Sequence, residues 1–275
     1  MKATLIIPIT LSSAVFLHAQ QGTVEDISTI YPQAFERAVK AKSATGIRAL
    51  YVNGNVVLNV TLKSDGAAHY YFKSNAKDWA AMVEEQITAP YELRISEVDY
   101  EMVGDNFAIS TARFDEYISG VHHADGYDLF TYVKTNVGWR INHMEVTLAL
   151  DEAKLPEKEV GIYDATALQR VLLQMEQDFP GQDSSLIKFM EGDDQITIND
   201  FHNGVLASTG NYGLKEIPGI LEGKPWEGAA LDLGEPQIVD GHMAYVVGTL
   251  GASEVLLTLI HQNKDWLITA FHINR

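Results

Sequence analysis

This chain contains nine histidines and no cysteine, so histidines and carboxylates are the side chains whose types could do chemistry. The absence of cysteine excludes disulfides, thiolate metal sites and thiol nucleophiles. The sequence has no HExxH motif, no Gly-x-Ser-x-Gly motif and no Gly-x-Gly-x-x-Gly or phosphate-loop motif. Zinc-hydrolase, esterase and nucleotide-loop chemistry therefore have no support, which leaves acid–base chemistry or ligand binding.

Two tryptophan-containing segments are expected to carry some of these side chains on β-strands. Side chains alternate between the faces of a strand. One face of the first strand is therefore expected to hold Trp139, Ile141, His143 and Glu145. One face of the second strand is expected to hold Trp266, Ile268, Ala270 and His272. If these faces line a pocket, their polar groups are His143, Glu145 and His272. The alternative is that they are half-buried strand residues with local hydrogen bonds. The candidate ligand-binding residues are Trp139, His143, Glu145, Tyr132, Trp266 and His202.

One expected loop could hold a metal ion. The segment from Gly120 to Gly126 contains His122, His123 and Asp125, whose side chains can act as ligands. A polar loop tip explains the same residues, so we expect no metal site and no cofactor.

The composition limits the partners. The chain has 275 residues, 46% of them hydrophobic, with 20 Lys and Arg against 37 Asp and Glu and a formal charge of −17. Such a charge argues against nucleic-acid binding and against docking on an anionic membrane, both of which need a cationic surface. We expect no nucleic acid partner and no membrane insertion.

The first twenty residues are typical of a secretory signal peptide. A positive start at Lys2 precedes an apolar run from Leu5 to Phe16, and small residues follow. The run is short for a membrane span. We therefore expect residues 1–20 to be removed and the protein to be exported, either periplasmic or secreted.

An internal repeat organises the rest of the chain. Residues 127–147 align without gaps with residues 254–274, which places Trp139 on Trp266. Each segment is typical of two strands joined by a polar turn. Upstream, residues 100–108 resemble residues 236–244 at a changed offset, which indicates an insertion around Gly120 to Gly126 in the first copy.

Each copy begins with a helical pattern of apolar residues, around Phe35 in the first and Leu172 in the second. Asn75 and Asp78 predict the N-terminal cap of a second helix in the first copy. A polar stretch at 151–160 predicts a linker, so the expected domains are 24–150 and 161–275. Helices on one face of an antiparallel sheet make each an α+β domain.

This order of elements resembles the nuclear-transport-factor-two-like superfamily, which includes ketosteroid-isomerase-like and SnoaL-like proteins. Gly138-Trp139-Arg140-Ile141 is similar to exported lumazine-binding-like members, and Asp265-Trp266-Leu267-Ile268 resembles the SnoaL-like ending. The resemblance implies two tandem cone-shaped domains, each a curved antiparallel sheet wrapped around N-terminal helices and enclosing an apolar pocket. Such cones commonly pair through their sheets, so an internal pseudo-dimer is expected.

The resemblance also implies where a catalytic base would lie, on the first strand after the opening helices. That position falls on Asn59 in the first copy, and on Asn199 or, with a shift of one residue, Asp200 in the second. An amide cannot accept the proton, so Asp200 and His272 are the catalytic candidates.

We expect an exported protein that binds a small apolar or aromatic molecule without catalysis, or that acts as a scaffold. Two alternatives remain open. One is a cofactor-independent isomerase, dehydratase or hydrolase in the second domain's pocket, and the other is a structural interaction module.

Overall fold

The computed structural model describes residues 24–62, 68–150, 165–179, 190–213, 216, 228–241, 243–262 and 265–275. The expected signal peptide (1–20) and linker (151–160) lie outside these residues. Among the described helices, none has the length and apolar character needed to cross a membrane.

Most helices of the first half precede its first strand, and one further helix lies between its second and third strands. They are α1 (Val24–Ser28), η1 (Thr29–Ala34), α2 (Phe35–Lys40), α3 (Ala44–Leu50) and α4 (Ala76–Gln86). The η1 segment is kinked at Tyr31, whose backbone is extended (φ −128°, ψ 130°), as the following Pro32 favours. The Asn75 cap of α4 is confirmed, since its side chain accepts a 2.9 Å hydrogen bond from the backbone N–H of Asp78.

Six strands form the sheet of the first half. They are β1 (Tyr51–Leu62), β2 (Ala68–Asn75), β3 (Tyr91–Val103), β4 (Phe107–Ile118), β5 (Val121–Thr135) and β6 (Gly138–Leu150). Their order is β2-β1-β6-β5-β4-β3. The sheet is mixed rather than wholly antiparallel, because β1 pairs in parallel with β6, the last strand of the meander.

The second half has one described α-helix, α5 (Ala165–Asp178), and its own sheet. The strands are β7 (Met190–His202), β8 (Val205–Gly213), β9 (Leu231–Leu233), β10 (Gln237–Asp240), β11 (Met243–Leu250), β12 (Ser253–Gln262) and β13 (Asp265–Asn274). Their order is β8-β7-β13-β12-β11-β10, and each strand takes the place of the corresponding strand in the order β2-β1-β6-β5-β4-β3 of the first sheet. Both β9 and β10 pair with β11, where the first half has the single long strand β3.

The two sheets also share their register. Tyr132 pairs with Ile141 in the first sheet, and Leu259 pairs with Ile268 at the aligned positions of the second. One residue further on, each sheet has a β-bulge, which leaves Asn142 in β6 and Thr269 in β13 as the extra residues. An α+β fold built on an internal repeat is thus confirmed by strand order, register and bulge.

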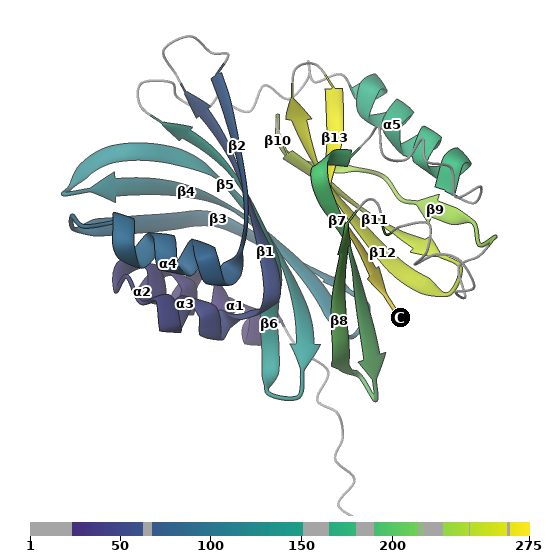
Figure 1. Cartoon of the computed structure of the whole chain (residues 1–275), viewed down its shortest axis with the longest axis horizontal. Coiled ribbons are helices and arrows are strands. Elements are labelled where there is room, and N and C mark those ends of the chain that lie inside the picture. Colours follow the sequence, from purple (N-terminus) through teal and green to yellow (C-terminus); the bar gives the residue numbers. More distant parts are fainter. Residues whose placement is uncertain are drawn as a thin grey trace, which may run out of the picture.

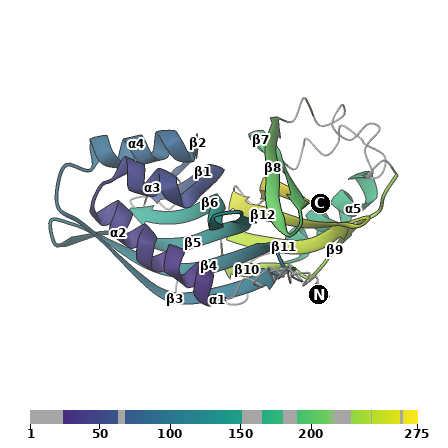
Figure 2. The ribbon, with the colours of Figure 1, turned by 90° about the horizontal axis from the view of Figure 1, so that it is seen from below.

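The two sheets pack against each other through the faces that their helices leave open. Figures 1 and 2 show α1 to α4 on one face of the first sheet and α5 on the outer side of the second. Apolar side chains of both sheets form one buried cluster between them: Val103, Phe107, Ile109, Leu129, Val133, Met243 and Leu256. Each half has a further apolar core under its own helices.

Candidate functional site

A cavity of about 190 Å³ lies between the helices and the sheet of the first half. Helices α2 and α4 supply one wall, and strands β3 to β6 supply the other. Its apolar lining consists of Phe35, Val39, Trp79, Met82, Val83, Ile87, Leu93, Phe114, Met144, Val146 and Leu148. Three lining residues have polar groups, namely Tyr91, Glu116 and Asp128. A mostly apolar cavity with a few polar groups is the usual form of a small-molecule site.

Asp128, on β5, is the most deeply buried polar residue of the cavity, with only 4% of its surface exposed. The hydroxyl of Tyr31 donates a 2.7 Å hydrogen bond to its Oδ2 atom. Burial raises the pKa of Asp128 to about 7, although the bond from Tyr31 acts in the opposite direction. The carboxyl group is therefore divided between its protonated and ionised forms near neutral pH.

Glu116, on β4, is a second carboxyl group with a raised pKa in the same cavity. Desolvation is the main cause, and His123 nearby lowers the pKa in part. Tyr91 lies beside Glu116, and burial raises the pKa of the Tyr91 hydroxyl, so this hydroxyl stays protonated. The charge of Glu116 also raises the pKa of Asp128. Two interacting carboxyl groups thus face one apolar space.

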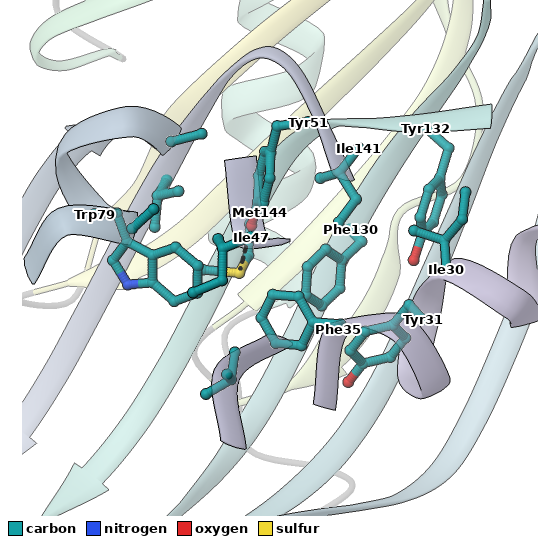
Figure 3. Packing of buried hydrophobic residues seen from close by; sticks show 14 of the residues in the cluster. Ile30, Tyr31, Phe35, Ile47, Tyr51, Trp79, Phe130, Tyr132, Ile141 and Met144 are labelled. Carbon is teal, nitrogen blue, oxygen red and sulfur yellow. Dashed lines mark hydrogen bonds between the residues drawn. The ribbon is translucent and has the colours of Figure 1, made fainter. Parts of the chain in front are cut away.

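Aromatic rings fix the helices around this cavity. The ring of Phe35 stacks on Trp79 at 5.8 Å between centroids and meets Phe130 edge-on at 5.1 Å. The ring centroids of Tyr31 and Phe130 lie 4.2 Å apart, and Tyr31 lies beside Phe35 (Figure 3). On another side, the Tyr51 hydroxyl donates to the sulfur of Met144 at 3.2 Å, drawn dashed in Figure 3. Tyr31 is held by this packing where its hydroxyl reaches Asp128.

The second half provides an internal comparison for these polar groups. Asp128 pairs with Ala112 across the strands, and the position with the same register in the second sheet is Val255, opposite Gly248. Likewise Tyr132 corresponds to Leu259. Val255 and Leu259 both belong to the apolar core under α5. At these positions the acidic and phenolic groups are present in the first half alone.

Three residues expected to bind a ligand lie in the cores of the two halves. Trp139 and Tyr132 belong to the first core, and Trp266 belongs to the second. The Tyr132 hydroxyl is 2.7 Å from the hydroxyl of Ser110. None of the three is among the lining residues of the cavity.

The expectation that His143 and Glu145 share a face with Trp139 is wrong. The bulge at Asn142 adds one residue to β6, so the strand places Met144 and Val146, rather than His143 and Glu145, on the cavity side. The bulge at Thr269 has the same effect on β13, where Phe271 and not His272 joins the core with Trp266. A bulge reverses the alternation beyond it, which a strict period of two cannot anticipate.

His143, Glu145 and His272 instead meet between the two sheets. The two imidazole rings lie 5.4 Å apart between centroids, and His143 Nε2 lies 3.6 Å from Glu145 Oε2. Burial lowers the pKa of His143 to about 3, lowers that of His272 well below its usual range, and raises that of Glu145 to about 7. Both histidines are therefore neutral at neutral pH.

Asp200 and His202 lie near the end of β7, and neither lines the cavity. Asp200 is partly exposed, pairs with Arg275 and accepts a hydrogen bond of 2.9 Å from Ser208. His202 is exposed. Asn199 is buried and donates to Asn274. The side chain of Asn59 lies outside the described residues. The structure therefore does not bring Asp200 and His272 to a common cavity.

The sequence reasoning missed Asp128, Tyr31, Glu116 and Tyr91 as site residues. One signal for Asp128 was present, since Asp128, Phe130 and Tyr132 alternate along one strand and share the helix-facing side. A carboxylate in such an aromatic row is costly to bury, which marks it as a candidate functional group. Tyr31 lacked such a signal, because its partner is 97 residues away.

The fold and the site together define an α+β protein of two repeated curved-sheet halves, with one carboxyl-bearing apolar cavity under the helices of the first. No family model and no curated protein matches the chain. Solved structures are similar to about half of it. A nuclear-transport-factor-two-like protein of unknown function from Pseudomonas putida has 15% identity and a TM-score of 0.35, over 45% of this chain and 84% of its own.

Two further structures have similar values. A nuclear-transport-factor-two-like protein with a cystatin-like fold, from Novosphingobium aromaticivorans, has 17% identity and a TM-score of 0.33, over 47% of this chain and 80% of its own. A protein of unknown function with a cystatin-like fold, from Nostoc punctiforme, has 11% identity and a TM-score of 0.35, over 48% and 92%.

Proposed function

We propose that the first half binds a small, mostly apolar molecule that carries one hydroxyl or carbonyl group. The observation that carries this proposal is the buried carboxyl group of Asp128, which faces an apolar cavity and is held by Tyr31. A buried acid without a function would be costly to keep, because an apolar side chain of similar size packs without that desolvation cost. The second half has Val255 at the matching register position.

The size of the cavity limits the ligand. About 190 Å³ is somewhat larger than the ~150 Å³ apolar cavity that holds benzene in another protein, and smaller than the roughly 300–1,000 Å³ of sites for drug-sized molecules. A single ring with one or two short substituents fits this space. The surrounding aromatic rings favour an aromatic ligand.

The polar group of the ligand follows from the protonation of Asp128. With a pKa of about 7, the carboxyl group can donate to a carbonyl when protonated, or accept from a hydroxyl when ionised. A ligand without such a group would desolvate this carboxyl group without adding a hydrogen bond to the one from Tyr31, which weakens binding.

Matched probes test the proposal. 4-Ethylphenol and ethylbenzene have the same shape apart from one hydroxyl, and their binding can be followed through the fluorescence of Trp79, which lines the cavity. We expect the wild-type protein to prefer 4-ethylphenol about tenfold or more, which is the effect of one hydrogen bond to a charged group. Asp128→Asn should reduce this preference, and Asp200→Asn, outside the cavity, should not. Equal preferences in wild type and Asp128→Asn would contradict the proposal.

Proton transfer in the same cavity is the second candidate function. It is favoured by the pKa of about 7 for Asp128, which suits a general acid or base at neutral pH. In this version the chemistry lies in the first half, not at Asp200. We expect deuterium exchange next to the carbonyl of 1-indanone, followed by NMR, to slow on the order of 100-fold in Asp128→Asn. If the wild-type protein does not exchange 1-indanone faster than buffer alone, proton transfer is contradicted and binding is the function.

Export remains part of the proposal and is supported by the apolar run from Leu5 to Phe16. N-terminal sequencing of the protein recovered outside the cytoplasm should begin between Gln20 and Gly22. Intact Met1 in that fraction would contradict export by cleavage.

A further inference from the structure

The hairpin of β4 and β5 is longer than its counterpart in the second half. Phe114 pairs with Gly126 in the first sheet, and Leu250 pairs with Ser253 at the same register position of the second, where the chain turns at once. Residues 115–125 therefore form an extension that the second half lacks. The segment expected to be a loop is largely paired strand, since β4 continues to Ile118 and β5 begins at Val121.

Three potential metal ligands come together on this extension. Asp115 and Asp125 are directly opposite each other across the two strands. His122 Nε2 lies 3.5 Å from Asp115 Oδ1 and 4.0 Å from Asp125 Oδ2. One ligand atom from each residue lies within 4.8 Å of the others. The sequence offered His122, His123 and Asp125 as possible ligands, although it favoured a polar loop tip without a metal ion. The strand pairing adds Asp115 to the group, and His123 is not part of it.

The arrangement of the two carboxylates is unfavourable without a cation. Like charges directly opposite each other destabilise a strand pair. The side chain of Asp125 is only 10% exposed, and among the described residues its buried Oδ1 atom has no hydrogen-bond partner. A buried carboxylate oxygen without a partner is the kind of group that a metal ion satisfies.

The neighbouring cation does not serve this purpose. Arg94 lies opposite Asp115 on β3, but its guanidinium group pairs with Glu92 at 2.9 Å and lies 4.1 Å above the ring of Tyr117. The same Tyr117 ring meets the His122 imidazole edge-on at 5.3 Å, which helps to orient it. His122 and Asp115 are 40% and 35% exposed, so an ion can enter from solvent.

We propose that Asp115, His122 and Asp125 bind a divalent transition-metal ion, with Zn²⁺ as the reference case. One imidazole and two carboxylates form a three-ligand set of a kind that Zn²⁺ accepts, with water in the fourth position. Ligands at about 2.0–2.1 Å on a tetrahedral ion lie about 3.3 Å apart. His122 Nε2 lies 3.5 and 4.0 Å from the two carboxylate oxygens, and all three ligand atoms lie within 4.8 Å of one another. No two ligand atoms therefore need to close by more than about 1.5 Å to reach this geometry. The proposed metal site does not rest on the function proposed for the cavity.

Titration of the tag-free protein with ZnCl₂ by calorimetry tests the site. We expect one Zn²⁺ per chain, and a dissociation constant that rises about tenfold or more in His122→Ala. Asp115→Asn should act in the same direction. Both side chains are partly exposed, so these variants are suited to remain folded, which circular dichroism checks.

His123→Ala is the matched control. His123 is the extra residue of a bulge in β5, where it lowers the pKa of Glu116. It is not one of the three grouped ligands. It should retain binding within about twofold of wild type. This is well below the roughly 10–100-fold loss of affinity that follows even when a residue that only supports a metal ligand is changed. The proposal is overturned if the wild-type protein shows no saturable binding, if His122→Ala binds like wild type, or if His123→Ala loses as much affinity as His122→Ala.

Discussion

Glu145 and His272 occupy the same register position in the two sheets, opposite Leu129 and Leu256 respectively, and each contacts the bulged residue of the other sheet. The Thr269 hydroxyl donates a 2.6 Å hydrogen bond to Oε2 of Glu145, and Nδ2 of Asn142 lies 3.3 Å from Nδ1 of His272. The contacts are reciprocal, as expected where two copies of one unit meet around a local two-fold axis. The bulges thus serve the contact between the sheets.

The first prediction concerns this contact. Thr269→Val should lower the free energy of unfolding by about 1–3 kcal/mol, because it leaves the buried Glu145 without this donor. Thr249→Val, at an exposed position of β11, should change it by less than about 0.5 kcal/mol. Urea unfolding measures both. In the double variant Thr269→Val with Glu145→Leu, part of the loss should be recovered, since the unpaired carboxyl group is gone. Additive effects of the two changes would contradict the coupling.

The second prediction concerns the pH dependence that Asp128 causes. Its pKa is about 7 in the folded chain, against about 3.9 for an unfolded aspartate, so the folded state binds the proton more tightly. Its contribution to stability is fully present below about pH 4 and is lost as the pH rises to about 7. The difference between wild type and Asp128→Asn should therefore shift against wild type by about 4 kcal/mol across this window.

Urea unfolding of both proteins at several pH values gives this difference. Titrating groups that do not interact with Asp128, including His143 and Glu145, are common to both proteins and cancel. Glu116 interacts with Asp128, so its own titration contributes to the difference. A difference that does not change between pH 4 and pH 8 would show that Asp128 titrates normally.

The third prediction concerns Tyr31. Its hydrogen bond favours the ionised form of Asp128, so Tyr31→Phe should raise the pKa of that carboxyl group further above 7. The carboxyl carbon signal in ¹³C NMR, followed against pH, measures this change. Tyr132→Phe is the control, because that hydroxyl is bonded to Ser110 instead. A lower pKa in Tyr31→Phe would contradict the assigned role of Tyr31.

The fourth prediction concerns Asp200, the catalytic candidate of the sequence. Its pair with Arg275 is about one-third exposed on both sides, so Asp200→Asn should cost less than about 1 kcal/mol of stability. Ligand binding and proton exchange by the first half should remain unchanged. Chemical unfolding and the 4-ethylphenol titration measure these effects. If Asp200→Asn stays folded but loses most of its ligand binding or proton exchange, the functional site lies in the second half.

The sequence by itself determined the internal repeat and the fold class. The alignment of Trp139 with Trp266 and the alternating apolar segments depend on residue type and short-range spacing, which can be recognised along the chain. The same local information predicted the cap at Asn75. Helix and strand patterns are local, so they are read without knowledge of the partners.

Only the tertiary structure decided which of the polar residues share a site. The bulges at Asn142 and Thr269 depend on the pairing with β5 and β12, and they move His143, Glu145 and His272 from the expected pocket to the contact between the sheets. The bond between Tyr31 and Asp128 joins residues 97 positions apart. Such contacts arise when helices pack onto the sheet, and burial then shifts the carboxyl pKa, which neither residue determines alone.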